Sequence, residues 1–375
     1  MLTKKNIVII HSNGHGMCAL LRGGALADLS QSLMTGEFEF IESPEVINDE
    51  YILKHTVAVI ICRLWREDQQ YMVRHYDKYR RRQGFGLKVF LEYDDLMWDL
   101  DGKQCIPAFN PAPINSAYAG KSIEAIADKI DGTFVTNAWL KACWEYRFHR
   151  TATVIPNFLP LHLYGERVHR IDEKIKKPVV LYGGSPYHFK KDMEGDFAGP
   201  WIPWIKYAVT HDLIEMHMFG RVGWMFEDIK DKIVLEPPSP SILWPMRIRD
   251  IAPDIYIGPL VDHPFNRAKS NLKYSEACAI GAAFVGSYWE QFCPYDGQFE
   301  LCRVPADTTP EQLQEKVDKI CEPETYNRIM EHQHEFISHM WLESSGNLTY
   351  VLKCILGDAL EVTGHGQVPA STPRS

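Results

Sequence analysis

Several features that would mark a specialised class of protein are missing from this sequence. No run approaches the roughly 18 apolar residues of a membrane-spanning helix, and the first residues lead into an apolar strand instead of a signal peptide. The nine cysteines, an odd number, include no CxxC pair, which argues against a zinc site and against a disulfide framework. We therefore expect a cytoplasmic protein whose thiols are reduced and mostly buried.

A positive balance of charge is missing as well. The formal net charge is −9, from 40 Lys and Arg against 49 Asp and Glu, which disfavours broad attachment to nucleic acid or anionic lipid. The one dense basic run, residues 79–83, precedes Gly84 and is typical of the C-terminus of an exposed helix. DNA is thus a partner that the charge does not favour.

What is present predicts a two-domain α/β protein. A chain of 375 residues is too long for a typical single core, and its 45% hydrophobic content is that of a globular protein. Apolar strands alternate with helices, which predicts parallel sheets. The strands are expected at residues 6–10, 57–63, 87–93, 132–137, 178–182, 214–219, 233–236, 255–260 and 283–286. The expected domains are 1–170 and 171–340, followed by a helix at 341–360 and a disordered tail at 361–375.

Two strands run into glycine-containing loops. Such loops let backbone amides approach a phosphate or a sugar ring at the carboxyl edge of a sheet. The first loop contains Gly14 and His15, and its spacing is not the GxGxxG of a dinucleotide site. His15, like His11 before it, is either an acid, base or sugar contact or a solvated or capping residue. The second loop begins with Gly183, Gly184 and Ser185.

Charged residues follow other strands. Asp94 and Asp95 directly follow the strand at 87–93. The carboxyl end of a strand is where α/β enzymes place functional groups. The two aspartates could bind a metal, contact an acceptor, or cap the next segment. Arg221 follows the strand at 214–219 and reaches either a pyrophosphate or solvent.

The most informative stretch is residues 265–287, expected as loop, helix and strand. Lys269, Ser270, Lys273 and Glu276 are expected near the start of that helix, with Lys269, Lys273 and Glu276 on one face. Two ammonium groups at a positive helix end suit a diphosphate, and a carboxylate one turn on suits ribose hydroxyls. The pattern indicates a sugar-nucleotide site; the alternative is a solvated helix start with ordinary surface charges.

This stretch, preceded by Pro259 and Leu260, resembles over about 30 positions the C-terminal signature of GT-B glycosyltransferases, especially family 4-like members of bacteria and phages. Two further stretches resemble the same group: the run from Asp94 to Leu96, and Gly184, Ser185, His188 and Asp192, the last one position late. One departure is Ala268, which stands where the family usually has a carboxylate.

The resemblance implies a GT-B fold, in which two Rossmann-like domains face a cleft and a C-terminal helix crosses back onto the first domain. It places the nucleotide sugar, with a UDP- or GDP-sugar favoured, mainly on the second domain, and Arg22 at the cleft near the acceptor. Asp94, Asp95 and Lys269 become the candidate catalytic residues, with no cofactor, no metal and retention of configuration expected.

The acceptor stays open between a glycan, a lipid-linked sugar, a protein and a modified DNA base, because acceptor loops carry no readable code. Two other functions stay open too. Because Ala268 lacks the usual carboxylate, the chain could be a noncatalytic sugar-nucleotide binding or scaffold protein. A sugar-nucleotide epimerase of the same fold is the third alternative.

Overall fold

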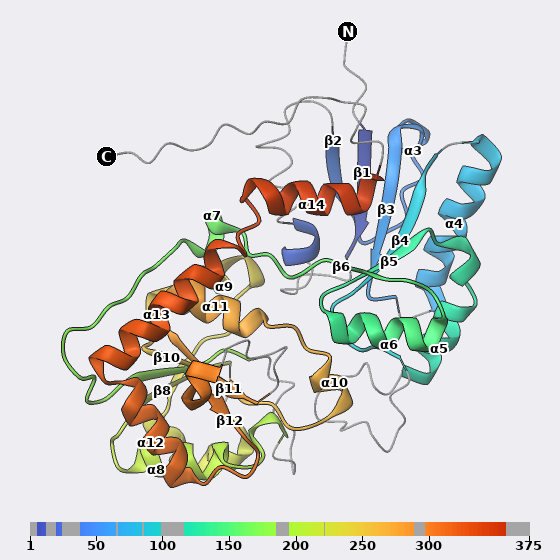
Figure 1. Ribbon diagram of the computed structural model, residues 1–375. Coiled ribbons are helices and arrows are strands. Elements are labelled where there is room, and N and C mark those ends of the chain that lie inside the picture. The colour runs from blue at the N-terminus through green and yellow to red at the C-terminus, as the bar shows by residue number, and fades with distance from the viewer. Residues whose placement is uncertain are drawn as a thin grey trace, which may run out of the picture.

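The computed structural model describes residues 6–12, 20–24, 38–64, 67–84, 86–98, 116–184, 195–220, 222–288 and 297–357. These residues form two parallel six-stranded sheets with helices packed around each (Figure 1). We call the parts of the chain built around them the first half and the second half. The predicted α/β fold class is confirmed.

The first sheet has the order β2-β1-β3-β4-β5-β6. Its strands are β1 (Asn6–His11), β2 (Phe38–Glu42), β3 (Thr56–Cys62), β4 (Lys88–Tyr93), β5 (Gly132–Val135) and β6 (Thr153–Val154). The edge strand β2 was not predicted, because its Phe-Glu-Phe-Ile-Glu sequence gives only a short alternating pattern with an exposed Glu39. The order changes direction between β1 and β3, which makes their carboxyl ends a natural binding position.

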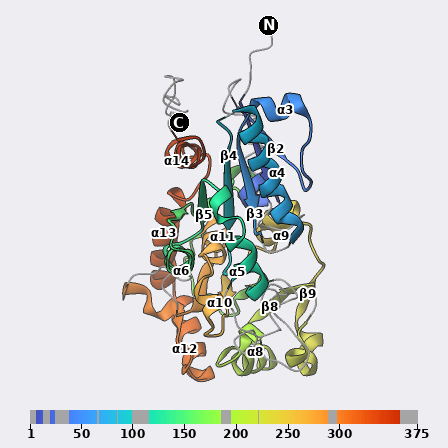
Figure 2. The same ribbon diagram turned by 90° about the vertical axis from the view of Figure 1, so that its right-hand side faces the viewer.

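Both faces of this sheet are buried, which explains its continuous apolar strands. Ile7 and Ile9 of β1 belong to a core cluster with side chains of α4, α5 and α6, whereas Val8 and Ile10 belong to a cluster with α14. Figure 2 shows α4 and α14 on opposite sides of the sheet. The helices of the first half are α3 (Glu50–His55), α4 (Glu67–Gln83), α5 (Ser116–Glu124) and α6 (Ala138–Phe148).

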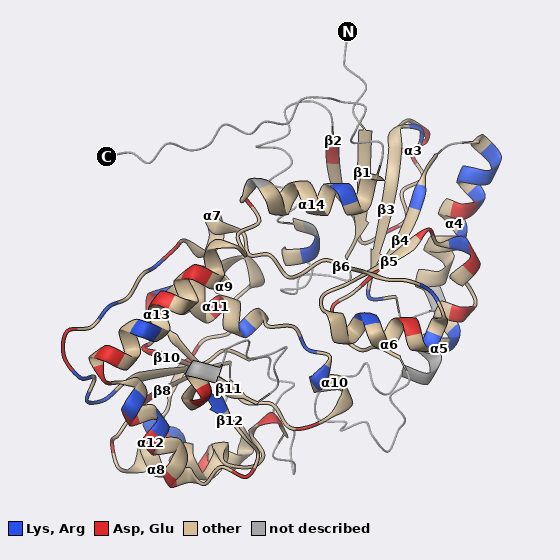
Figure 3. Cartoon of the chain, viewed as in Figure 1, with Lys and Arg blue, Asp and Glu red and all other residues tan. Residues whose placement is uncertain are grey.

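The basic run at residues 79–83 ends α4, as predicted. Figure 3 shows its arginines at the end of that helix. Arg80 and Arg81 both pair with Asp77 of the same helix, and Arg80 also pairs with Asp131. These cations are therefore largely neutralised within the protein.

The second sheet has the order β12-β11-β10-β7-β8-β9. Its strands are β7 (Val179–Tyr182), β8 (Glu215–Phe219), β9 (Val234–Glu236), β10 (Ile255–Gly258), β11 (Ala283–Ser287) and β12 (Arg303–Val304). The strand order reverses between β7 and β10, as in dinucleotide-binding sheets. The first strand of the sheet thus ends at Tyr182, and Gly183 follows directly at the reversal point.

Most of the helices that belong to the second half pack around this sheet. The helices of the second half are α7 (Leu161–Tyr164), α8 (Trp201–Thr210), α9 (Trp244–Ile251), α10 (Pro264–Arg267), α11 (Leu272–Ile280), α12 (Pro310–Ile320) and α13 (Pro323–Ser338), followed by α14 (Ser345–Leu356). Val351, Leu352 and Ile355 of α14 lie in the core cluster of the first sheet. The C-terminal helix therefore packs on the first half, as Figure 1 shows in red.

The six cysteines within the described ranges are all free, and four of them are buried. Within the same ranges, no helix is both long enough and apolar enough to cross a membrane.

Candidate functional site

Gly183 lies at the reversal point of the second sheet because a side chain would not fit there. A Cβ atom would lie 2.7 Å from Trp244 Cζ2 and in collision with the Tyr256 hydroxyl, and the same construction at Gly184 collides with Tyr182. The glycine pair is therefore required because the side chains of Trp244, Tyr256 and Tyr182 pack directly against it. The same absence of side chains leaves the backbone open to a ligand.

Lys273 of α11 reaches this bend. Its Nζ donates to the Gly183 carbonyl and lies 5.4 Å from the centre of the Tyr182 ring. Burial lowers the pKa of Lys273; the charges of Glu276 and Asp196 raise it and that of Lys269 lowers it. The structure thus brings together the glycine loop and the lysine helix, which are about 90 residues apart in sequence.

Glu276 is buried one turn further along α11. Its Oε1 accepts hydrogen bonds from the Tyr164 hydroxyl at 2.9 Å and from Trp244 Nε1 at 2.8 Å, and its Oε2 accepts one from the Tyr256 hydroxyl at 3.0 Å. Burial raises the pKa of Glu276, while Lys273 and the three donors lower it. No sequence pattern pointed to Tyr164, Trp244 and Tyr256, which come from three separate elements.

Lys269 and Ser270 lie just before this helix, so the expectation that Lys269 shares a helical face with Lys273 and Glu276 is wrong. The stretch forms two helices, α10 and α11, and both residues lie in the loop between them. In a continuous helix the Ala268 carbonyl would accept from the amide of Leu272, but here it accepts from Asn137 Nδ2 at 2.8 Å. A contact with the first half has replaced a helical hydrogen bond.

The loop between α10 and α11 is bound to the first half at several points. Lys269 Nζ donates to Asp95 Oδ1 at 2.8 Å, and Asn157 Nδ2 donates to Ser270 Oγ at 2.8 Å. Phe265 and Ala268 are buried in the core cluster of the first sheet, although they belong to the second half in sequence. The loop therefore connects α11 with the carboxyl edge of the first sheet.

Asp94 and Asp95 both contact Arg63, a residue that no sequence motif marks. Arg63 follows β3 with a φ of 49°, in the left-handed region. Its guanidinium contacts both Asp94 oxygens, with Nη2 at 2.6 Å from Oδ2, and Nη2 also lies 2.8 Å from Asp95 Oδ2. No helix follows the pair in the described residues up to Trp98, so capping finds no support there.

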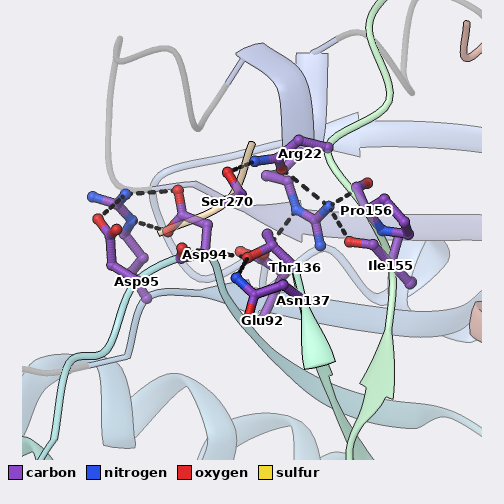
Figure 4. A network of polar contacts seen from close by, with 11 residues as sticks. Arg22, Glu92, Asp94, Asp95, Thr136, Asn137, Ile155, Pro156 and Ser270 are labelled. Atoms are coloured by element: carbon purple, nitrogen blue, oxygen red, sulfur yellow. Dashed lines mark hydrogen bonds and ion pairs between the residues drawn. The ribbon is translucent and has the colours of Figure 1, made fainter. Parts of the chain in front are cut away.

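Arg22 lies in the same network but is buried, with 8% of its surface exposed. Its Nε donates to Glu92 Oε1 at 2.7 Å, and its Nη1 donates to the carbonyls of Ile155 at 2.8 Å and Pro156 at 3.1 Å (Figure 4). Burial raises the pKa of Glu92, and the charge of Arg22 opposes this shift. In this structure Arg22 ties strands of the first sheet together; its contact with an acceptor stays a prediction.

Four predicted residues, Gly14, His15, Ser185 and Arg221, lie outside the described residues. Their roles stay predictions.

His11 is described, and it is buried between two partners. Nδ1 lies 2.8 Å from the Ser43 carbonyl and Nε2 lies 2.8 Å from the Tyr76 hydroxyl, which also accepts from the amide of Ile47. This pattern fits a neutral ring that donates from Nδ1 and accepts at Nε2. Burial lowers the pKa of His11 from 6.5 to about 4, so the ring is uncharged at neutral pH.

This shift predicts a pH dependence of stability. Between pH 6.5 and 4 the unfolded chain binds the proton at His11 and the folded chain does not, so stability falls as the pH drops through this window. The loss reaches at most about 3 kcal/mol. Urea unfolding at pH 7, 5.5 and 4.5 measures this loss. His11→Gln should show a shallower decline of stability than wild type, whereas His55→Gln, at the end of α3, should show the same decline as wild type. Equal slopes in all three proteins would contradict the assigned neutral state.

Two Rossmann-like α/β halves, with ligand-suited groups at the carboxyl ends of their strands, define the GT-B class of folds. No protein-family model and no curated protein matches the sequence. Among solved structures, the chain is similar to the apo form of the lipopolysaccharide outer core galactosyltransferase WaaB, with a TM-score of 0.52 and 12% identity over 93% of this chain and 99% of that one.

It is also similar to an α,α-trehalose 6-phosphate synthase from Burkholderia multivorans, with a TM-score of 0.54 and 9% identity over 98% of this chain and 100% of that one. A trehalose-6-phosphate synthase studied with bisubstrate glycomimetics gives a TM-score of 0.54 and 11% identity over 94% and 99% of the two chains. At these identities the similarity establishes the fold, and the predicted GT-B fold is confirmed.

Proposed function

We propose that the protein is a glycosyltransferase that moves a sugar from a nucleotide-sugar donor, bound mainly to the second half, to an acceptor on the first half. The observation that carries this proposal is the contact between Lys273 and the Gly183 carbonyl at the reversal point of the second sheet. Open α/β sheets bind their ligands in the crevice at this point. Two of the solved structures that the chain is similar to are described as a galactosyltransferase and a trehalose 6-phosphate synthase.

The chemistry of a diphosphate suits this position. Among the described residues, Asn271 at the start of α11 makes no side-chain hydrogen bond to the first amides of the helix, so these donors can face an anion. Lys273 and Lys269 add positive charge. In the proposed reaction they stabilise the nucleoside diphosphate as the glycosidic bond breaks, with no covalent intermediate on the protein.

The nucleoside would extend toward Glu276. A carboxylate has about four acceptor positions, and tyrosine and tryptophan donors take three of them here. The remaining position would accept a ribose hydroxyl, while the three protein donors hold the carboxylate rigid. We propose a UDP- or GDP-sugar as donor.

Asp94 and Asp95 would position the acceptor hydroxyl at the edge of the first sheet. We propose a metal-independent reaction that retains the anomeric configuration, since one structure of this fold comes from work on glycosyl transfer with retention. The acceptor is a glycan, a lipid-linked sugar, a protein or a modified DNA base.

Lys269→Ala is expected to lower transfer by on the order of a hundredfold, because one preorganised positive charge is lost from the leaving group. Release of nucleoside diphosphate from a panel of nucleotide sugars measures this. Lys206→Ala is the matched control. Lys206 lies on α8, and its ammonium also pairs with an aspartate, Asp228, at 2.8 Å. Equal turnover by the Lys269 and Lys206 variants would reject the role of Lys269.

One observation favours a noncatalytic binding protein instead. Ala268, at the position where a carboxylate is usual, has 0% exposure and packs in the core cluster of the first sheet. A binding protein would be stabilised thermally by a nucleotide sugar but would release no nucleoside diphosphate. Detection of that product excludes this alternative.

A further inference from the structure

The loop between α10 and α11 links the proposed donor site to the acidic pair of the first half through a single side chain. Resting on the proposed function, we infer that the donor diphosphate and the Asp95 carboxylate compete for Lys269, so that donor binding releases Asp95 for the acceptor. Binding of the donor would then precede and enable productive binding of the acceptor.

Lys269 is placed to exchange between two anions. Its ammonium lies 2.8 Å from Asp95 Oδ1 and 4.4 Å from the centre of the Phe265 ring. Its side chain keeps 23% of its surface exposed, so it is not locked in a core. Lys269 also precedes Asn271, the N-cap residue of α11, by two positions, and its charge lowers the pKa of Lys273 on that helix. An anion bound at the amino end of α11 therefore lies near the charge of Lys269.

The backbone of the loop does not have to move for this exchange. Asn137 holds the Ala268 carbonyl and Asn157 holds the Ser270 hydroxyl, each at 2.8 Å. These bonds fix the residues on either side of Lys269. The flexible four-carbon stem of the lysine alone can carry its charge from one anion to the other.

Release of Lys269 would change Asp95 without freeing it completely. Asp95 Oδ2 stays at 2.8 Å from Arg63 Nη2, while Oδ1 loses its lysine donor. Before the exchange, Arg63 and Lys269 place two positive charges against the two carboxylates of Asp94 and Asp95. After it, Asp95 Oδ1 can accept a hydrogen bond from a sugar hydroxyl.

Asp95→Asn tests the inference, because it removes the competing charge with little change of shape. Calorimetric titration with UDP, GDP, ADP, CDP and dTDP should show about fivefold tighter binding of the preferred nucleotide than in wild type, since a partly exposed ion pair of modest strength no longer competes. Transfer at saturating donor should fall at least tenfold. A merely structural role of Asp95 would weaken nucleotide binding instead.

Two further variants complete the cycle. Asp228→Asn removes a carboxylate from a comparable lysine–aspartate pair on the surface and should leave nucleotide affinity unchanged. In the Lys269→Ala background, Asp95→Asn should no longer tighten nucleotide binding, because the lysine for which Asp95 and the diphosphate compete is absent.

Unchanged or weaker nucleotide binding by a folded Asp95→Asn protein, with wild type binding normally, would overturn the exchange and leave the proposed function standing. Tightening that persists in the Lys269→Ala background would overturn it as well. Failure of wild type to bind any of the five nucleotides would overturn both.

Discussion

Replacing Lys273 with alanine is expected to lower sugar transfer by on the order of a thousandfold, the upper range for losing one preorganised donor. The lysine reaches the glycine bend at the reversal point of the second sheet, where the proposed diphosphate leaves. Its ammonium is fixed by the Gly183 carbonyl and the Tyr182 ring before any ligand arrives. Little reorganisation is therefore needed when charge develops on the leaving group. Steady-state release of nucleoside diphosphate, with calorimetric binding of the same nucleotide, separates loss of chemistry from loss of affinity.

Lys316→Ala provides the matched control. Lys316 is also partly buried, donates to the carbonyls of Glu300 and Arg303, and has its pKa lowered first by burial. It lies near β12, away from the glycine bend, so its loss should cost stability but not transfer by the folded protein. Equal turnover in the two variants would place the donor elsewhere.

Arg22→Ala is expected to lower the free energy of unfolding by about 3–5 kcal/mol. The substitution leaves the Glu92 carboxylate, which has 3% exposure, without its cation. It also removes the donor to the Ile155 and Pro156 carbonyls, so the end of the first half loses a tie to β4. Urea denaturation monitored by circular dichroism measures the change.

The control is Arg170→Ala, which breaks the ion pair with Glu331 in which both side chains are more than half exposed. That variant should lose less than about 1 kcal/mol. The double variant Arg22→Met with Glu92→Leu should recover most of the lost stability, because no unpaired charge stays buried. A similar loss in the single and double variants would show that packing, not charge, decides the stability here.

Much of the fold could be read from the sequence because the strands are buried on both faces. The apolar runs at β1, β3, β4, β10 and β11 follow from this burial. β9 was expected as a strand at 233–236, and it lies at an edge of the second sheet. The capping box of α12, with Thr309 as N-cap and Pro310 at the first position, is equally local. By contrast β2, half exposed at an edge, gave too weak a pattern.

The candidate site was only partly readable. Gly183, Lys273 and Glu276 were named from local patterns, and the structure gathers them because the sheet reverses between β7 and β10. Arg63 was not found, since nothing in a lone arginine after a strand shows that two carboxylates of the next strand face it.

The sequence by itself determined the alternation of strands and helices, the two parallel sheets and the residue types at their carboxyl edges, because burial and backbone preference act over a few neighbouring positions. Tertiary structure alone decided that the helix breaks before α11, that Lys269 meets Asp95, and that Arg22 is buried against Glu92. The physical reason is that each of these outcomes depends on a partner between 70 and 174 positions away. The energy of such a contact exists only once the two halves of the chain have met.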